Sequence, residues 1–271
     1  MTLSTPIALT IAGSDSGGGA GIQADLKTFS ALGVYGASVI TALTAQNTRE
    51  VRAIHDVPAD FIAAQLDTVF DDLEVNAVKI GMLSRPETIR TVAAILRERR
   101  LTNIVLDPVM VAKSGDKLLA DEAVDALRSE LLPLARLITP NLPEAAVLLG
   151  VAEADSHEAM REQAEALLQL GPQAVLIKGG HLPDSAGDDS ADLLLVRTQA
   201  HWLPARRIPT RNTHGTGCTL SSAIAAGLAR GLDIQPAVDE AKAYITEAIQ
   251  AADRLHVGSG HGPTHHFHRW W

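Results

Sequence analysis

The chain has 271 residues, of which 46% are hydrophobic, and a formal net charge of −9. This length and composition suit one large α/β domain with a substantial core, and they exclude a long disordered segment. The acidic balance argues against a nucleic-acid partner, and no apolar run approaches the length of a membrane span.

The chain contains one cysteine, Cys218, so it cannot form an internal disulfide. A single free thiol favours a reducing, cytoplasmic setting. The first six residues lack the basic and apolar regions of a signal peptide. We therefore expect a cytoplasmic protein that does not associate with membranes.

Short apolar runs alternate with helical patterns along most of the chain. The expected strands, in chain order, are residues 7–12, 37–45, 51–57, 77–80, 104–106, 137–139 and 174–177. The expected helices are residues 22–32, 59–70, 86–99, 121–131, 142–149, 156–170, 219–230 and 236–254. Apolar strands separated by helices are typical of a mostly parallel central sheet with helices on both faces. Residues 193–208 are strand-rich without a helix, so we expect a small antiparallel hairpin at the sheet edge.

The chain shows no internal repeat and no abrupt change in composition, which predicts a single domain spanning residues 1–271. Residues 254–271 form a C-terminal tail rich in His and Trp. The tail lacks carboxylates at a rigid spacing, so we expect its aromatic side chains to pack on the fold or on a partner subunit. Residues 183–190 are the best candidate for a disordered loop.

Polar loops follow most of the expected strands. Because ligands bind beyond the carboxyl ends of the strands in such sheets, we expect these loops to meet at one rim. The loops are residues 14–21, 46–47, 81–82, 107–108, 141, 178–180 and 212–218.

The clearest indication of chemistry is the turn Gly215-Thr216-Gly217 at the start of a helix, followed by Cys218. Backbone N–H groups converge at a helix start, and the helix dipole adds positive charge, so the turn suits a phosphoryl group in transfer. A thiol in a first helical turn is expected to have a lowered pKa, which makes Cys218 the expected base. His214 is the alternative base, and a lone cysteine can also be a small buried hydrophobic residue.

Residues 14–21 form a glycine-rich loop between a strand and a helix. Part of the loop matches a dinucleotide-binding fingerprint, but the next strand ends in Gln46-Asn47 and lacks the acid that would hold a ribose. We expect a different ligand to lie against this backbone, with a structural turn as the alternative. The Gln46 amide suits a neutral heteroaromatic ring, unless it only forms a turn. Asp25 is either a solvated helix acid or faces the rim.

Further polar side chains suggest a site for a nucleotide and a metal ion. Asp107, with Asn141 and Glu144, could hold a hydrated Mg²⁺, although Asp107 could also start a turn and Asn141 could cap a helix. Lys178 precedes two glycines, so a polyphosphate could approach it closely. The alternative for Lys178 is a purely structural role.

Eight motifs run in order through nearly the whole chain. They are AGSDSGGGAGIQADLK (12–27), TAQNT (44–48), KIGML (79–83), DPVM (107–110), TPNLPE (139–144), KGGH (178–181), GTGCTLS (215–221) and GHGP (260–263). Together they resemble the ribokinase-like superfamily and, more narrowly, the bacterial hydroxymethylpyrimidine/phosphomethylpyrimidine kinases of thiamine biosynthesis.

The resemblance implies an enzyme that uses ATP and Mg²⁺, with a requirement for a monovalent cation left open. Its substrates would be 4-amino-5-hydroxymethyl-2-methylpyrimidine and then the monophosphate of that alcohol. Family members form homodimers, so a homodimer is expected. The nearest alternative is a pyridoxal/pyridoxine kinase, and a non-catalytic sensor of a thiamine precursor is an alternative of another class.

The resemblance also implies a role for each candidate residue. The residues implied to hold the pyrimidine are Gln46, Asp25, Met82 and Gly13. Those implied to act in catalysis are Cys218 as the base and the backbone of Gly215, Thr216 and Gly217. Those implied to contact ATP are Lys178, Thr213 and Asn141, and those implied to serve Mg²⁺, mostly through water, are Glu144 and Asp107. Residues 109–117 would form a flap over the nucleotide.

Overall fold

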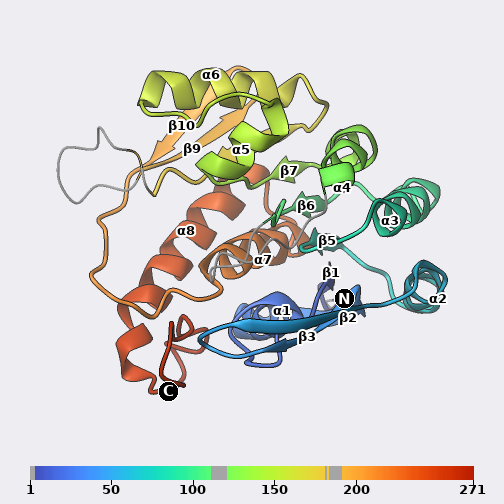
Figure 1. Cartoon of the computed structure of the whole chain (residues 1–271), viewed down its shortest axis with the longest axis horizontal. Coiled ribbons are helices and arrows are strands. Elements are labelled where there is room, and N and C mark those ends of the chain that lie inside the picture. Colours follow the sequence, from blue (N-terminus) through green and yellow to red (C-terminus); the bar gives the residue numbers. More distant parts are fainter. Residues whose placement is uncertain (1–3, 111–120, 181, 183–190) are drawn as a thin grey trace.

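The structure is a computed structural model that describes residues 4–110, 121–180, 182 and 191–271. An eight-stranded sheet with the order β10-β9-β8-β7-β6-β5-β1-β2 runs through its centre (Figure 1). Its strands are β1 (Ile7–Ala12), β2 (Tyr35–Ile40), β5 (Ala77–Ile80), β6 (Ile104–Leu106), β7 (Leu137–Ile138), β8 (Ala174–Ile177), β9 (Asp192–Val196) and β10 (Gln199–Leu203).

The strands from β2 to β8 along this order run parallel to one another, and β9 and β10 form an antiparallel hairpin at the edge. The mostly parallel sheet and the edge hairpin predicted from the sequence are therefore confirmed. Every residue of β5, β6 and β8 is buried, as expected for apolar strands covered on both faces, and β5 includes one buried lysine, Lys79.

Helices cover both faces of the sheet (Figure 1). One face packs against α1 (Gly21–Ala31), α7 (Thr216–Ala229) and α8 (Ile234–Gln250). The other packs against α2 (Ala59–Phe70), α3 (Pro86–Glu98), α4 (Asp121–Ala126), α5 (Leu142–Leu149) and α6 (His157–Leu168). Small residues let α7 lie deep in its layer, where a Cβ on Gly227 would come within 2.9 Å of Ala237.

The expected single strand over residues 37–45 is wrong. The chain leaves the main sheet at Thr41, whose hydroxyl donates a hydrogen bond to the carbonyl oxygen of Met82. It then forms β3 (Ala42–Gln46), which pairs with β4 (Val51–Asp56) in a separate two-stranded antiparallel sheet. A run of apolar and hydroxyl residues such as 37–45 does not reveal where the chain passes from one strand to the next, because both strands have the same composition.

One further difference concerns where a helix begins. Helix α7 begins at Thr216, earlier than the predicted residue 219, so Cys218 lies within its first turn. Residues 111–117 of the expected flap and the expected disordered loop 183–190 lie outside the described residues. Among the helices that the structure describes, none combines the length and the apolar character needed to cross a bilayer.

Candidate active site

The turn that leads into α7 is built around Gly215, and we call residues 213–218 the anion turn. Gly215 has φ of 80°, in the left-handed region that favours glycine. A Cβ at this position would overlap with the carbonyl oxygen of Gly19. The anion turn therefore packs directly on the glycine-rich loop, and only glycine permits that approach.

The backbone amides of the anion turn are only partly satisfied within the protein. The amide of Thr216 donates to the carbonyl of Thr213 at 3.3 Å, and the amide of Thr219 donates to the carbonyl of Gly215 at 2.8 Å. The amides of Gly217 and Cys218 have no hydrogen-bond partner among the described residues. Two adjacent free donors at a helix N-terminus form a site for an anion.

Cys218 lies on this first helical turn, but its thiol does not have the lowered pKa that the sequence suggested. Burial raises the pKa of Cys218 to about 11, and the carboxylates of Asp25 and Asp107 add to the effect. The ammonium of Lys79 and the backbone amide of Gly21 act in the opposite direction without reversing the shift. The expectation of a thiol activated by the helix terminus alone is therefore wrong, because desolvation of the thiolate outweighs it.

Asp25 lies beneath the rim and does not face it. Its carboxylate accepts hydrogen bonds from Thr10 Oγ1 at 2.7 Å and Ser222 Oγ at 2.6 Å. It also pairs with Lys79 Nζ at 2.9 Å, and both side chains are fully buried. All of these partners are internal, so the structure shows Asp25 in a buried ion pair, and its contact with the pyrimidine stays a prediction.

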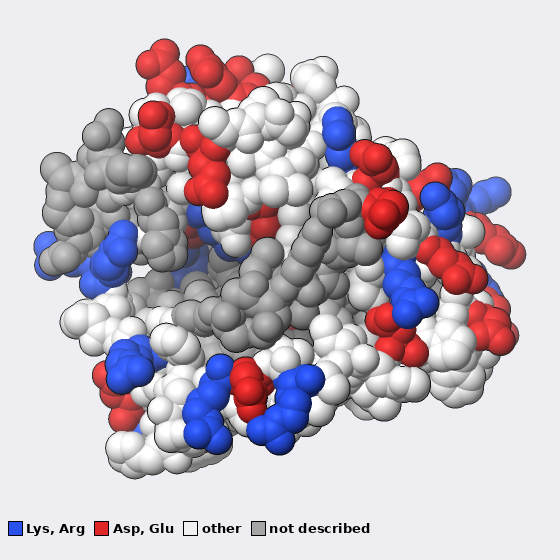
Figure 2. Space-filling model, viewed as in Figure 1, with Lys and Arg blue, Asp and Glu red and all other residues white. Residues whose placement is uncertain are grey.

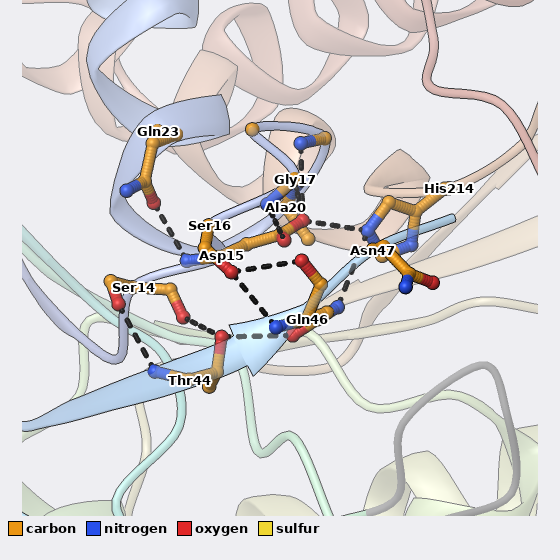
Figure 3. A network of polar contacts seen from close by, with 12 residues as sticks. Ser14, Asp15, Ser16, Gly17, Ala20, Gln23, Thr44, Gln46, Asn47 and His214 are labelled. Atoms are coloured by element: carbon orange, nitrogen blue, oxygen red, sulfur yellow. Dashed lines mark hydrogen bonds and ion pairs between the residues drawn. The ribbon is translucent and has the colours of Figure 1, made fainter. Parts of the chain in front are cut away.

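The glycine-rich loop is organised by its own aspartate, Asp15 (Figure 3). The carboxylate of Asp15 accepts hydrogen bonds from the amides of Gly17, Gly19 and Ala20 at 2.8, 3.0 and 2.8 Å. Burial tends to raise the pKa of Asp15, but the bonds from His214 and from the loop amides lower it overall. These amides are therefore occupied by Asp15 and do not form the ligand cradle that the sequence suggested.

His214 connects the glycine-rich loop to the end of β3 (Figure 3). Its Nε2 atom lies 2.7 Å from the Asp15 carboxylate and 3.5 Å from Nε2 of Gln46. An Nε2–H bond to Asp15 leaves no acceptor for the Gln46 amide. The hydroxyl of Thr44 lies 3.3 Å from Oε1 of Gln46, but it donates to the carbonyl of Ser14 at 2.9 Å. The Gln46 amide thus keeps its capacity to bind a ligand.

Met82 and Gly13 lie in contact next to this amide-bearing strand. A Cβ on Gly13 would lie 2.6 Å from Cε of Met82, and Met82 is 9% exposed. The structure therefore brings together Gly13 and Met82, two of the four residues implied to hold the pyrimidine.

A second charged group lies where β6, β7 and β8 end, and we call Asp107, Glu144 and Lys178 the carboxylate–lysine cluster. Lys178 Nζ lies 3.0 Å from Oδ1 of Asp107 and 3.8 Å from Oε2 of Glu144. A Cβ on Gly217 would lie 3.3 Å from Lys178 Nζ. The cluster is therefore adjacent to the free amides of the anion turn.

The two carboxylates of the cluster differ in their protonation. Burial alone would raise the pKa of Asp107, but the ammonium groups of Lys178 and Lys79 lower it overall. Burial raises the pKa of Glu144 to about 7; attraction to Lys178 lowers it and the weaker repulsion from Asp107 raises it, but burial dominates both. Glu144 therefore changes charge near neutral pH.

Asn141 and Glu144 form the capping box of α5, which was the alternative reading of this pair. The Asn141 side chain accepts from the amide of Glu144 at 2.8 Å, and Glu144 accepts from the amide of Asn141 at 2.8 Å. Capping accounts for the spacing of these residues without a metal.

The donor set fits a hydrated Mg²⁺ better than a fully liganded one. In the described part of the chain, no three His, Cys, Asp or Glu side chains converge as metal ligands. The oxygens of Asp107 accept from Lys178, Thr139 and Ser221, so they could meet Mg²⁺ only through its waters.

Sequence reasoning assigned no role to Asp15 or Lys79. A lysine inside the apolar strand Ala77–Ile80 was a usable signal, because a buried lysine requires a partner. Three successive glycines after an aspartate were also a signal, since their free amides can turn toward that carboxylate.

Charge is unevenly distributed over the face drawn in Figure 2. Basic side chains gather along the left and lower edges of that view, interspersed with a few acidic ones, whereas the upper edge is largely acidic. The acidic chain thus presents local positive charge on this face, which suits an anionic ligand.

Comparison with known proteins gives a consistent result. A model of the phosphomethylpyrimidine kinase family matches residues 15–265. The chain is 62% identical to the hydroxymethylpyrimidine/phosphomethylpyrimidine kinase of Rhizobium meliloti, over 98% of this chain and 99% of that protein. A crystal structure of phosphomethylpyrimidine kinase from Clostridium difficile aligns with a TM-score of 0.79 and 48% identity, covering 90% of this chain and 99% of that one.

An ADP complex of Bacillus subtilis pyridoxal kinase aligns with a TM-score of 0.90 and 41% identity, covering 99% of this chain and all of that one. The backbone agreement is thus higher with a pyridoxal kinase, while the sequence agreement is higher with the pyrimidine kinases. The wider backbone agreement follows in part from coverage, since the C. difficile chain aligns with a smaller share of this one.

Proposed function

This chain belongs to the phosphomethylpyrimidine kinase family, and we propose that it transfers the γ-phosphoryl group of ATP to 4-amino-5-hydroxymethyl-2-methylpyrimidine and then to the resulting monophosphate. Its activity is that of a hydroxymethylpyrimidine/phosphomethylpyrimidine kinase of thiamine biosynthesis. What remains to be assigned is which residues carry the reaction and which cofactors serve it.

One observation carries the assignment of the reacting centre. The free amides of Gly217 and Cys218, the Cys218 thiol and the Lys178 ammonium all lie around the start of α7. Amides fixed in this way stabilise the charge that spreads over a phosphoryl group in transfer, and they need no rearrangement during the reaction. Gly215 and Thr216 supply the backbone that holds them.

The pyrimidine would lie between the end of β3 and the start of the loop after β5. Gln46 offers both a donor and an acceptor to the ring nitrogen and the amino group, while Met82 packs against the ring beside Gly13. Asp25 would hold the buried Lys79 ammonium in place through their ion pair. This arrangement favours a ring with mixed donors and acceptors.

The nucleotide phosphates would approach Lys178 and the anion turn, with Thr213 and Asn141 nearby. Glu144 and Asp107 would hold Mg²⁺ through its waters, and the ion supplies charge that offsets the phosphate oxygens. A nucleotide is also supported by the ADP complex of the structurally similar B. subtilis kinase.

In the transfer itself, the hydroxymethyl oxygen attacks the γ-phosphorus and the bond to the β–γ bridging oxygen breaks, which releases ADP. The Cys218 thiol first loses its own proton to solvent, and the thiolate then accepts the proton of the hydroxyl group. The raised pKa makes this thiolate scarce at neutral pH, so only a small fraction of the enzyme carries the base at any moment. The hydroxyl proton becomes acidic only as its oxygen bonds to phosphorus, so it moves late, after most of the bond to the bridging oxygen has broken. Such a sequence suits phosphoryl transfer, where positioning and charge stabilisation matter more than a strong base.

Pyridoxal kinase is the second candidate, because of the TM-score of 0.90 to the B. subtilis enzyme. An assay that couples ADP formation to NADH oxidation tests both. We expect turnover with the pyrimidine alcohol and with its monophosphate, and much weaker turnover with pyridoxal. An equal or higher kcat/KM with pyridoxal would make pyridoxal kinase the favoured function. ADP formation with none of the three substrates would reject the proposed function.

We further propose a homodimer in the cytoplasm. The ribbon of β3 and β4 exposes Leu43 and Ile54, which are 48% and 40% exposed, and Tyr35 of neighbouring β2 is 57% exposed. Apolar side chains on a two-stranded ribbon favour burial against a second copy. Light scattering after size exclusion would give the mass, and a monomer at micromolar concentration would contradict the dimer.

A further inference from the structure

The last part of the chain passes through the site, and we call residues 260–266 the clasp. In Figure 1 the C-terminal segment lies at the lower left, beside one end of the ribbon formed by β3 and β4. The clasp makes hydrogen bonds to three segments that are far apart in the sequence: the loop after β3, the anion turn and α7. A tail that served only to cover the fold would not need directional contacts with all three.

One end of the clasp holds Thr48. The amide of Gly260 donates to the Thr48 hydroxyl at 3.1 Å, and the amide of His261 donates to the Thr48 carbonyl at 2.8 Å. A Cβ on Gly260 would overlap with that carbonyl, so the approach requires glycine. Thr48 follows Gln46 by two residues. The clasp therefore fixes the position of the end of β3, where Gln46 is proposed to bind the pyrimidine.

The middle of the clasp holds His214. The amide of His214 donates to the carbonyl of Gly262 at 3.0 Å, and the amide of Thr264 donates to the carbonyl of His214 at 3.2 Å. Pro263 lies between them and faces Gly19, whose Cβ would come within 3.2 Å of the proline ring. The clasp thus holds the anion turn against the glycine-rich loop.

The other end of the clasp holds the first turn of α7. Nε2 of His266 lies 3.0 Å from Oγ1 of Thr219, the residue directly after Cys218. The hydroxyl of Tyr244 donates to the carbonyl of His266 at 2.6 Å, which fixes the histidine from behind. Burial lowers the pKa of His266 to about 3, so the ring is neutral at any working pH.

The aromatic end of the tail contributes little to this anchoring. Trp270 and Trp271 are 70% and 65% exposed, although the Trp271 ring lies 4.7 Å from that of His265. In contrast, Thr264 and His266 are 0% and 5% exposed. Buried hydrogen bonds, rather than packing of the two tryptophans on the fold, therefore hold the tail, and packing of the tryptophans on a partner subunit stays a prediction.

We propose that the clasp is a positioning element with two separable ends, in which Thr48 governs pyrimidine affinity and His266 governs the rate of phosphoryl transfer. This inference rests on the proposed function. The physical reason is that each end holds a different part of the reaction: the strand end that carries Gln46, and the helical turn that carries Cys218. Displacement of a reacting group by a fraction of an ångström lowers turnover without weakening substrate binding.

The first test varies the Thr48 end in the full-length enzyme, with the pyrimidine alcohol varied at saturating Mg-ATP. Thr48→Val removes the hydroxyl that Gly260 contacts, and Thr48→Ser keeps it. We expect Thr48→Val to raise KM for the alcohol about five- to tenfold, the effect of about one hydrogen bond, with kcat within about twofold. Thr48→Ser should restore the wild-type KM.

The second test varies the His266 end under the same conditions. His266→Phe keeps a ring but loses the contact with Thr219, whereas His266→Gln keeps a hydrogen-bonding group. We expect His266→Phe to lower kcat about tenfold with KM within about twofold, and His266→Gln to recover part of kcat. If His266→Phe does not fold, Thr219→Val removes the same contact from the other side, with Thr219→Ser as its control.

Trp270→Ala is the matched control, since Trp270 belongs to the same tail, is 70% exposed and makes no ring contact with the clasp in the described part of the chain. It should leave kcat and KM unchanged. If the Thr48 and His266 variants instead change kcat and KM together, in proportion to their fall in Tm, the clasp is only structural and the inference is overturned. A wild-type enzyme that forms no ADP with the pyrimidine alcohol would reject the proposed function itself, which is a different outcome.

Discussion

The Nζ atom of Lys79 lies 2.9 Å from Oδ2 of Asp25, and neither side chain has any exposed surface. Ser222, one helical turn after Cys218, donates to the same carboxylate at 2.6 Å. The pair therefore joins β5, α1 and α7 directly beneath the anion turn. Its charges also act on the thiol in opposite directions, since Lys79 lowers the pKa of Cys218 and Asp25 raises it.

Removal of one member of this pair should be costly. Lys79→Met leaves the Asp25 carboxylate buried without its counter-charge, and we expect the free energy of unfolding to fall by about 3–5 kcal/mol. The double variant Lys79→Met with Asp25→Asn should recover part of that loss, because no uncompensated charge remains. Urea unfolding at pH 7.5 measures both. A loss below about 1 kcal/mol for the single variant would show that the buried pair does not stabilise the fold.

The raised pKa of Cys218 predicts slow alkylation. Because the folded pKa is about 11, the thiol is protonated throughout the neutral range. We expect iodoacetamide to label Cys218 about 100-fold more slowly at pH 7.5 than free cysteine, with a rate that rises about tenfold per pH unit up to pH 9.5. Mass spectrometry of labelled protein gives the rate. A plateau below pH 8 would mean that the thiol is already activated.

Turnover should nevertheless depend on this side chain. Cys218→Ser places a weaker acid in the same position, and we expect kcat to fall about 100-fold, at the lower end of what general bases contribute. KM for the pyrimidine alcohol should change less than about threefold, because the ring contacts lie on Gln46 and Met82. Steady-state kinetics with both substrates decide the matter, and an unchanged kcat would remove Cys218 from the reaction.

Much of this fold was predictable because its signals are local. Apolar runs gave β5, β6 and β8 with their observed limits, and the Asn-x-x-Glu spacing at Asn141 is the signature of the capping box that the structure contains. The anion turn was also local, since a glycine-bounded helix start needs no distant partner to be recognised.

The features of the site that the sequence did not predict depend on contacts between residues far apart in the chain. The burial of Asp25 requires Lys79 and Ser222 from two other elements, and no pattern around Asp25 contains them. The raised pKa of Cys218 likewise arises from desolvation by surrounding segments, whereas the sequence shows only the helix start. The clasp was missed for the same reason, because its partner Thr48 lies more than 200 residues earlier.

The ionised Glu144 carboxylate should lower the free energy of unfolding above neutral pH, which is also where its charge would serve Mg-ATP. Its folded pKa of about 7 lies above the ordinary value of 4.5, so folding favours the protonated form. The wild-type protein therefore loses stability as the pH rises from about 4.5 through 7. Glu144→Gln keeps a capping side chain and avoids this loss. We expect its Tm to exceed that of the wild type by a few degrees at pH 8 and to equal it at pH 4, below both pKa values.

The same variant should be a poor kinase, since it lacks the charge that would serve Mg²⁺. Thermal unfolding at the two pH values and kcat/KM for Mg-ATP at pH 8 are the measurements. A lower Tm at pH 8 would contradict the direction of the pKa shift, and full activity would remove Glu144 from the metal site.

Gly215 allows the most direct test of the anion turn, because the chain provides a matched control. Gly215 and Gly231 have similar left-handed φ values of 80° and 87°. A Cβ on Gly231 would meet nothing within 4 Å, whereas a Cβ on Gly215 would overlap with the carbonyl of Gly19. Both alanine variants therefore carry the same backbone strain of about 1 kcal/mol, and only one of them carries a steric clash.

We expect Gly231→Ala to lose about 1 kcal/mol of stability with kcat unchanged. Gly215→Ala should lose more stability than Gly231→Ala. Its kcat/KM for ATP should fall at least about 100-fold, because the amides of Gly217 and Cys218 move away from the glycine-rich loop and no longer point at the same phosphoryl oxygens. Urea unfolding and steady-state kinetics separate strain from clash. Equal effects of the two substitutions on kcat/KM would mean that the close packing of Gly215 on Gly19 does not position the phosphoryl site.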